Sequence, residues 1–209
     1  MNSLRTHESG TYLERRDGTP FLYLGDTAWD LFHRLREGEA DAYLRDRAAK
    51  GFTVIQAVVL AELDGLEVPN AGGALPLQDR NPERPVEEYF AHVDTIVRRA
   101  NELGLVVGML PTWGRYWKRS GDRPGDTIFT PANARVYGSW LGARYWEADL
   151  IWIMGGDRDV DTDEERAILD AMAEGLREGD GGNHLFTFHP RGHGRSAEAL
   201  PQVAWVDFH

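Results

Sequence analysis

The sequence predicts an α/β fold of the (β/α)8 barrel type, with the first six strand–helix units present in a single domain spanning residues 1–209. Apolar runs of strand length alternate with segments of helical periodicity, which indicates a parallel sheet with right-handed crossovers. An open doubly wound sheet is the alternative, but it concentrates its functional groups at one switch point. Here polar or aromatic residues follow successive runs, as in a barrel. No Gly-x-Gly-x-x-Gly or phosphate loop supports a nucleotide-binding sheet.

The first element is a hairpin over residues 12–24, with Asp17 and Gly18 in its turn. Its second arm, residues 21–24, is expected to be the first barrel strand, which ends close to an acid and a tryptophan. Residues 39–50 carry apolar side chains at helical spacing, and Gly51 is expected to end this helix.

The middle of the chain continues the alternation. Residues 53–60 are β-branched and nearly all apolar, which predicts the second strand. A loop rich in Pro, Gly, Asn and Asp runs from 68 to 85 and is long enough to overhang a site. Residues 86–103 have a continuous apolar stripe and predict a helix, and residues 105–110 predict the third strand.

The last part supplies three further strands. A helix is expected to begin at Thr130, a side-chain cap followed by a proline. Residues 150–154 predict the fourth strand, and they precede a helix over residues 162–179 with acids in its first turn. The fifth and sixth strands are expected at residues 184–188 and 203–208.

Composition limits the classes of partner. The net charge of −11 argues against nucleic acid and anionic membranes, which attract basic surfaces. The chain has no cysteine, so disulfides and thiolate metal sites are excluded. Its start lacks the pattern of a secretion signal, and no run approaches about 18 apolar residues. We therefore expect a soluble, cytoplasmic protein, with small molecules or sugars open as ligands.

The most informative stretch is the fourth strand, which stops at two glycines followed by Asp157 and Arg158. A carboxylate just past a buried parallel strand lies where α/β proteins keep their chemistry. A general acid at this place requires apolar walls or a neighbouring carboxylate to keep it protonated. Arg158 is a candidate for binding the substrate. The alternative interpretation is that Asp157 only pairs with Arg158 or caps the following turn.

Other strand ends supply further candidates. Asp26, Glu62 and Asp207 could face Asp157 or bind sugar hydroxyls. The alternatives are that Asp26 caps a helix, that Glu62 and Asp64 solvate a loop, and that Asp207 holds a neighbouring loop at the rim of the core. The aromatic residues Trp29, Trp113, Tyr116 and Trp117 follow strands, where their faces could stack on a sugar or pack as a loop. His189 could donate to a substrate hydroxyl or orient a carboxylate. The His and acid spacing does not match a metal motif, and no cofactor signature occurs.

Several strings resemble the apiosidase-like proteins of glycoside hydrolase family 140. They occur in order along the chain: Gly25-Asp26-Thr27-Ala28-Trp29, Gly51-Phe52-Thr53-Val54-Ile55-Gln56, Asp64-Gly65-Leu66, Leu110-Pro111-Thr112-Trp113-Gly114, Trp152-Ile153-Met154-Gly155-Gly156-Asp157-Arg158 and His189-Pro190-Arg191-Gly192. The resemblance implies a retaining glycosidase that removes apiose from the pectin rhamnogalacturonan II. It also implies that Asp157 is the acid/base.

The sequence departs from the family pattern at its C-terminal end. Family members continue through a Gly-Glu-Pro segment that supplies the nucleophilic Glu on the seventh strand, whereas this chain stops at His209. The serine cluster that follows the His-Pro motif in the family is represented here by Ser196 alone. An incomplete barrel would expose its first and sixth strands, so we expect a homo-oligomer or a second chain to cover them. The competing interpretation is a non-catalytic carbohydrate-binding or scaffold protein without the nucleophile.

Overall fold

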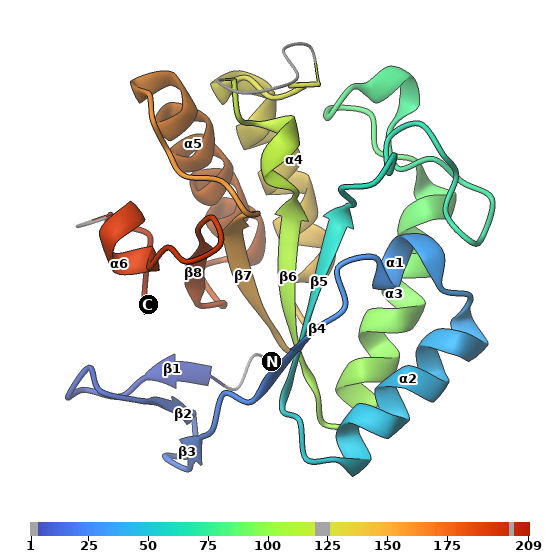
Figure 1. Ribbon diagram of the computed structural model, residues 1–209. Helices are drawn as coiled ribbons and strands as arrows, with labels where there is room; N and C mark the ends of the chain where they lie inside the picture. Colours follow the sequence, from blue (N-terminus) through green and yellow to red (C-terminus); the bar gives the residue numbers. More distant parts are fainter. Residues whose placement is uncertain (1–3, 120–125, 201–202) are drawn as a thin grey trace.

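The computed structural model describes residues 4–119, 126–200 and 203–209, and its central feature is a parallel sheet of five strands. The strands are β4 (Gly25–Thr27), β5 (Val54–Leu60), β6 (Val106–Thr112), β7 (Leu150–Gly155) and β8 (Phe186–His189). Their order in the sheet follows their order in the chain, as it does in a barrel, and together they form a curled half-barrel (Figure 1). The predicted α/β class, with part of a (β/α)8 barrel present, is confirmed.

Helices connect each strand to the next. They are α1 (Leu31–Arg34), α2 (Glu37–Ala49), α3 (Glu87–Glu102), α4 (Pro131–Tyr145), α5 (Asp163–Asp180) and α6 (Ser196–Ala199), with 3-10 turns η1 (Gln78–Arg80) and η2 (Gly114–Tyr116). In Figure 1 the helices α2 and α3 lie to the right of the sheet, and α5 lies at the upper left with α4 next to it. Within the described ranges, no helix is long and apolar enough to cross a membrane.

The local signals of the sequence explain these elements. Every residue of β6 and β7 is buried, because helices and the barrel interior cover both faces of these strands. Thr130 begins α4 as expected, since its side-chain oxygen accepts from the Asn133 N–H and Pro131 occupies the first helical position. The helix α5 has three acids in its first turn and ends at Gly181, which has a φ of 67°.

The N-terminal hairpin is confirmed, but the first barrel strand begins later than predicted. β2 (Leu13–Arg15) pairs with β3 (Pro20–Phe21) and with β1 (Leu4–Thr6), all antiparallel. This small sheet lies at the lower left of Figure 1, apart from the helices. The residues between it and β4 include Leu22 and Leu24, which are 71% and 42% exposed. The apolar run over residues 21–24 is therefore not a buried strand, and the parallel pairing starts at Gly25.

The sixth strand predicted over residues 203–208 is wrong. Residues 203–209 form a turn and irregular backbone beside β8. The N–H of Asp207 donates to the carbonyl of Phe186 at 2.9 Å, and the Thr187 hydroxyl donates to the carbonyl of Phe208 at 2.9 Å. Apolar alternation in this segment reflects burial of Val203 and Trp205 and not a ladder of backbone bonds. The edges of the described parallel sheet are therefore β4 and β8.

Candidate active site

The candidate site is built around the turn that follows β7. Gly155, Gly156 and Asp157 have φ angles of 103°, 101° and 61°, so three consecutive residues adopt left-handed backbone. Glycine takes this conformation without a steric penalty, whereas a non-glycine residue there is uncommon, with aspartate among the types that adopt it most often. The turn brings Asp157 to the end of β8, where its Oδ1 lies 3.4 Å from Nε2 of His189. The side chain of Asp157 remains 47% exposed.

Aromatic rings surround the histidine. The ring centroid of Trp29 lies 5.1 Å from that of His189 and 5.4 Å from that of Trp113, and the Trp113 and His189 centroids are 6.1 Å apart. The structure thus brings together four candidates from the ends of β4, β6, β7 and β8. Trp113 is buried, and its Nε1 has no hydrogen-bond partner among the described residues.

Burial sets the charge of His189. Loss of water contact lowers the pKa of His189, and the nearby Asp157 carboxylate opposes this effect without cancelling it. A neutral imidazole has one N–H donor and one nitrogen acceptor. Nε2 of His189 lies close enough to Asp157 Oδ1 to restrain the orientation of the carboxyl group.

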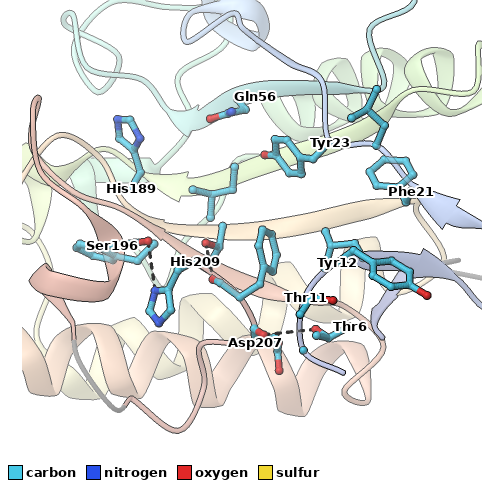
Figure 2. Close-up of a pocket in the computed structure, with 17 residues that line it drawn as sticks. Thr6, Thr11, Tyr12, Phe21, Tyr23, Gln56, His189, Ser196, Asp207 and His209 are labelled. Atoms are coloured by element: carbon cyan, nitrogen blue, oxygen red, sulfur yellow. Dashed lines mark hydrogen bonds between the residues drawn. The ribbon is translucent and has the colours of Figure 1, made fainter. Parts of the chain in front are cut away.

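A cavity of about 790 Å³ opens from His189 along the concave face of the half-barrel (Figure 2). Gln56, Tyr23 and Thr187 are among its lining residues, with Phe208 and His209 from the C-terminal segment. The sequence reasoning did not single out Gln56 or Thr187. A detectable signal existed, because each is a polar residue that interrupts an apolar strand, and in a barrel such residues point to the interior.

Asp26 does not reach this cavity, contrary to the expectation that it binds a sugar hydroxyl. It lies within β4, where side chains alternate between the two faces. Its Oδ2 accepts from the Tyr43 hydroxyl at 2.9 Å and pairs with Arg47 Nη1 at 3.1 Å, and both partners belong to α2. Asp26 therefore connects the first strand to the outer helix layer and does not cap a helix.

Asp207 also differs from the expectation that it could face Asp157. Its Oδ2 accepts from the N–H of Phe186 at 2.8 Å, and its carboxylate pairs with Arg177 at 3.2 Å. Phe186 begins β8, whereas His189, beside Asp157, ends it. Asp207 is thus at the opposite end of the strand, where it attaches the C-terminal segment to the sheet.

The stacking role expected for the aromatic loop after β6 is also corrected. Trp113, Tyr116 and Trp117 are each exposed by 1% or less, so they offer no ring face to a sugar in this structure. The Tyr116 hydroxyl donates to the Ala61 carbonyl at 2.8 Å, and Trp117 Nε1 donates to the Gly155 carbonyl at 2.8 Å. The loop over residues 113–117 is therefore part of the packed core next to the turn that carries Asp157.

The remaining candidates lie at the rim. Glu62 is partly buried and Asp64 is exposed, and both follow β5. Arg158 is exposed and donates to the backbone carbonyl of Asp157 at 2.8 Å. It therefore does not form the carboxylate pair considered for it, and the substrate-binding roles of these three residues stay predictions. In the part of the chain that the structure describes, no group of three or more His, Asp or Glu residues could hold a metal ion.

Comparison with known proteins identifies the fold and the family. A crystal structure of a glycoside hydrolase family 5 protein from Bacteroides vulgatus ATCC 8482 is 32% identical, with a TM-score of 0.84 over 99% of this chain and 43% of that chain. A structure described as a glycoside hydrolase is also 32% identical, with a TM-score of 0.78 over 99% of this chain and 45% of that one. The catalytic domain of a Thermobifida fusca endoglucanase, 13% identical with a TM-score of 0.59 over 98% of this chain and 62% of that one, shares the fold.

The chain thus spans less than half the length of the two more similar structures. No curated protein matches it. The family model for the apiosidase-like catalytic domain matches residues 7–209, which is nearly the whole chain and includes every residue of the site described above. With this match and the two structures at 32% identity, the chain belongs to the apiosidase-like catalytic domain family and is a glycoside hydrolase-like domain.

Proposed function

We propose that the chain hydrolyses a glycosidic bond in plant cell-wall polysaccharide, as an apiosidase acting on side chains of rhamnogalacturonan II, with Asp157 as the general acid/base. The observation that carries the proposal is the position of Asp157, which follows a buried barrel strand on left-handed backbone and lies against His189. Strained backbone of this kind persists where a functional side chain must be aimed.

The chemistry requires two carboxyl groups. In a retaining mechanism they lie about 5 to 5.5 Å apart on either side of the scissile bond. The Asp157 carboxyl donates its proton to the glycosidic oxygen while the second carboxylate attacks the anomeric carbon and forms a glycosyl ester. Asp157 then removes a proton from water, which attacks the ester and releases the sugar. The neutral imidazole of His189 keeps the Asp157 carboxyl oriented through both steps.

Leaving-group dependence tests the role of Asp157. A phenolate leaves without protonation, whereas an alkoxide needs the acid. We expect Asp157→Ala to reduce turnover of a methyl apioside on the order of 10³-fold and that of a 4-nitrophenyl apioside much less in the glycosylation step. Asp163→Asn, which changes an exposed carboxylate in the first turn of α5, is the matched control. Equal losses on both substrates, or no loss, would refute the acid role.

A non-catalytic carbohydrate-binding domain is the second candidate function. It is favoured by the positions of Asp26 and Asp207, because two of the carboxylates considered as partners of Asp157 are bound elsewhere. Calorimetry with an apiose-containing oligosaccharide distinguishes the two functions. Binding without turnover by the unmodified chain supports the binding domain, and turnover excludes it.

We further propose that another polypeptide, in the first instance a second copy of this chain, covers the open side of the half-barrel. Among the described strands β4 pairs with β5 alone, and the exposed Leu22 and Leu24 precede it. An unpaired strand edge next to exposed apolar side chains favours association. The unpartnered Nε1 of Trp113 also supports an incomplete site, since buried donors ordinarily have acceptors. Light scattering after size-exclusion chromatography tests this, and a stable monomer at all concentrations would exclude the second copy.

A further inference from the structure

The backbone before Asp157 is enclosed by the neighbouring strand ends. A Cβ added at Gly155 would lie 2.4 Å from the carbonyl oxygen of His189, and one added at Gly156 would lie 2.6 Å from the nitrogen of Gly114. Contacts this short do not occur in proteins, so both positions require glycine. The turn over residues 155–157 is therefore closely packed between the loop after β6 and the end of β8.

Hydrogen bonds fix the same turn from both sides. The N–H of Gly156 donates to the His189 carbonyl, and the N–H of Gly114 donates to the Gly156 carbonyl, both at 3.1 Å. These two bonds depend on backbone alone. The third comes from a side chain, because Trp117 Nε1 donates to the carbonyl of Gly155 at 2.8 Å.

Trp117 is suited to hold a backbone group in place. It is fully buried directly after η2, and the preceding residues of this loop contact the turn through Gly114. On the far side of the acid, Lys118 Nζ donates to the carbonyl of Asp159 at 2.9 Å and pairs with the fully buried Glu165 at 2.9 Å. The loop after β6 thus contacts the chain both before and after Asp157.

We propose that Trp117 is a positioning residue, which holds the Gly155 carbonyl and so sets the Asp157 carboxyl against His189. The inference rests on the proposed role of Asp157 as acid/base. Left-handed backbone at a non-glycine residue is unfavourable and persists where the surroundings impose it. Removing the indole N–H leaves a buried carbonyl without its donor and lets the turn relax. A displacement of about 1 Å at a reacting group can reduce the rate about 100-fold.

The test compares Trp117→Phe with Tyr116→Phe. Both variants remove one buried donor from the same loop, but the Tyr116 hydroxyl donates to Ala61, on the β5 side, and does not touch the turn. The first measurement is an NMR titration of His189, which requires no substrate. Since the Asp157 carboxylate raises the pKa of His189 against the effect of burial, Asp157→Asn lowers the titration midpoint.

We expect Trp117→Phe to lower the His189 midpoint in the same direction as Asp157→Asn, and Tyr116→Phe to keep the midpoint of the unmodified chain. A midpoint unchanged in Trp117→Phe overturns the proposal, and so does an equal shift in both loop variants. If Trp117→Phe fails to fold, β-(3-benzothienyl)alanine at position 117 retains the shape of tryptophan without its N–H and takes its place in the comparison.

The second measurement is hydrolysis of the methyl apioside. We expect Trp117→Phe to lower kcat on the order of 10- to 100-fold with little change in KM, because the acid is displaced while the cavity is intact. An unmodified chain that does not hydrolyse apiosides refutes the proposed function, and the titration then still decides whether Trp117 positions Asp157. Normal kcat in a variant with a shifted His189 midpoint overturns the positioning role.

Discussion

Replacement of Gly142 by alanine should destabilise the protein, because the helices α4 and α5 approach each other at glycines. A Cβ at Gly142 would lie 2.3 Å from the carbonyl oxygen of Leu176, and one at Gly175 would lie 2.2 Å from that of Arg135. Gly138 and Gly179 make equivalent close approaches. The opposing atoms belong to helical backbone and cannot rotate away, so the two helices must separate.

The magnitude follows from two opposing effects. Helix propensity favours alanine over glycine by about 1 kcal/mol. Overpacking against a rigid neighbour costs about 1–3 kcal/mol, and contact with backbone on the opposing helix places this variant at the upper end. We expect Gly142→Ala to lower the free energy of unfolding by about 2 kcal/mol, which corresponds to a fall in Tm of about 4–8 °C for a chain of this size.

Gly38 is the matched control. It lies in the helix α2, and a Cβ added there would meet nothing within 4 Å. Gly38→Ala should therefore show the propensity effect alone, with a gain of up to about 1 kcal/mol. Thermal unfolding followed by circular dichroism measures both variants. If Gly142→Ala is as stable as Gly38→Ala, close helix packing does not determine the choice of glycine and the reasoning fails.

Three further predictions concern the charged groups Asp180, Glu165 and Asp207. Asp180 is buried and accepts hydrogen bonds from Trp152 and His184 at 2.8 Å each. Asp180→Ala should therefore lower the free energy of unfolding, measured by urea titration, by about 3–5 kcal/mol. A loss below about 1 kcal/mol would contradict this. Lys118→Met removes the ammonium group that pairs with the buried Glu165 and should lower the free energy of unfolding by a similar amount. Arg135→Gln, at an exposed ion pair, is the control and should lower it by less than about 1 kcal/mol. Burial raises the pKa of Asp207 above its usual 3.8, so ionisation of this group removes stability as the pH rises from the unfolded pKa through the folded pKa. Asp207→Asn should not show this loss, and a stability difference between the two proteins that does not depend on pH would contradict the shift.

The sequence predicted the elements whose signals are local. The apolar run that ends at Gly155 and Gly156 predicted both β7 and the position of Asp157 after it. A buried strand requires apolar residues, and left-handed backbone favours glycine, so both features are visible in the sequence. The cap at Thr130 is another case of this kind. The parallel order of the strands also followed from the alternation of strand and helix.

The direction of side chains at strand ends was not predictable in the same way. With the first strand placed over residues 21–24, Asp26 would follow its end and could turn toward the site. The pairing of Gly25 with Val54 places Asp26 inside the strand, and alternation then directs it to α2. The burial of Trp117 depends on contacts with Gly155, a residue far away in the sequence, and aromatic content alone cannot show it.

The backbone that carries Asp157 is closely held, whereas the side chain of Asp157 is open to solvent. The turn at residues 155–157 is held by hydrogen bonds with Gly114 of η2, with Trp117 and with His189 of β8, so contacts within this chain set the position of Asp157. Yet 47% of the Asp157 side chain is exposed, and Asp157 is not among the residues that line the cavity beside His189. A general acid and its carboxylate partner function best in a closed, dry site. A partner on the open side of the half-barrel would therefore shield Asp157 from water. If a second copy does this, turnover per chain should rise with protein concentration in parallel with the oligomer measured by light scattering. Constant turnover per chain across the monomer–oligomer transition would separate activity from association.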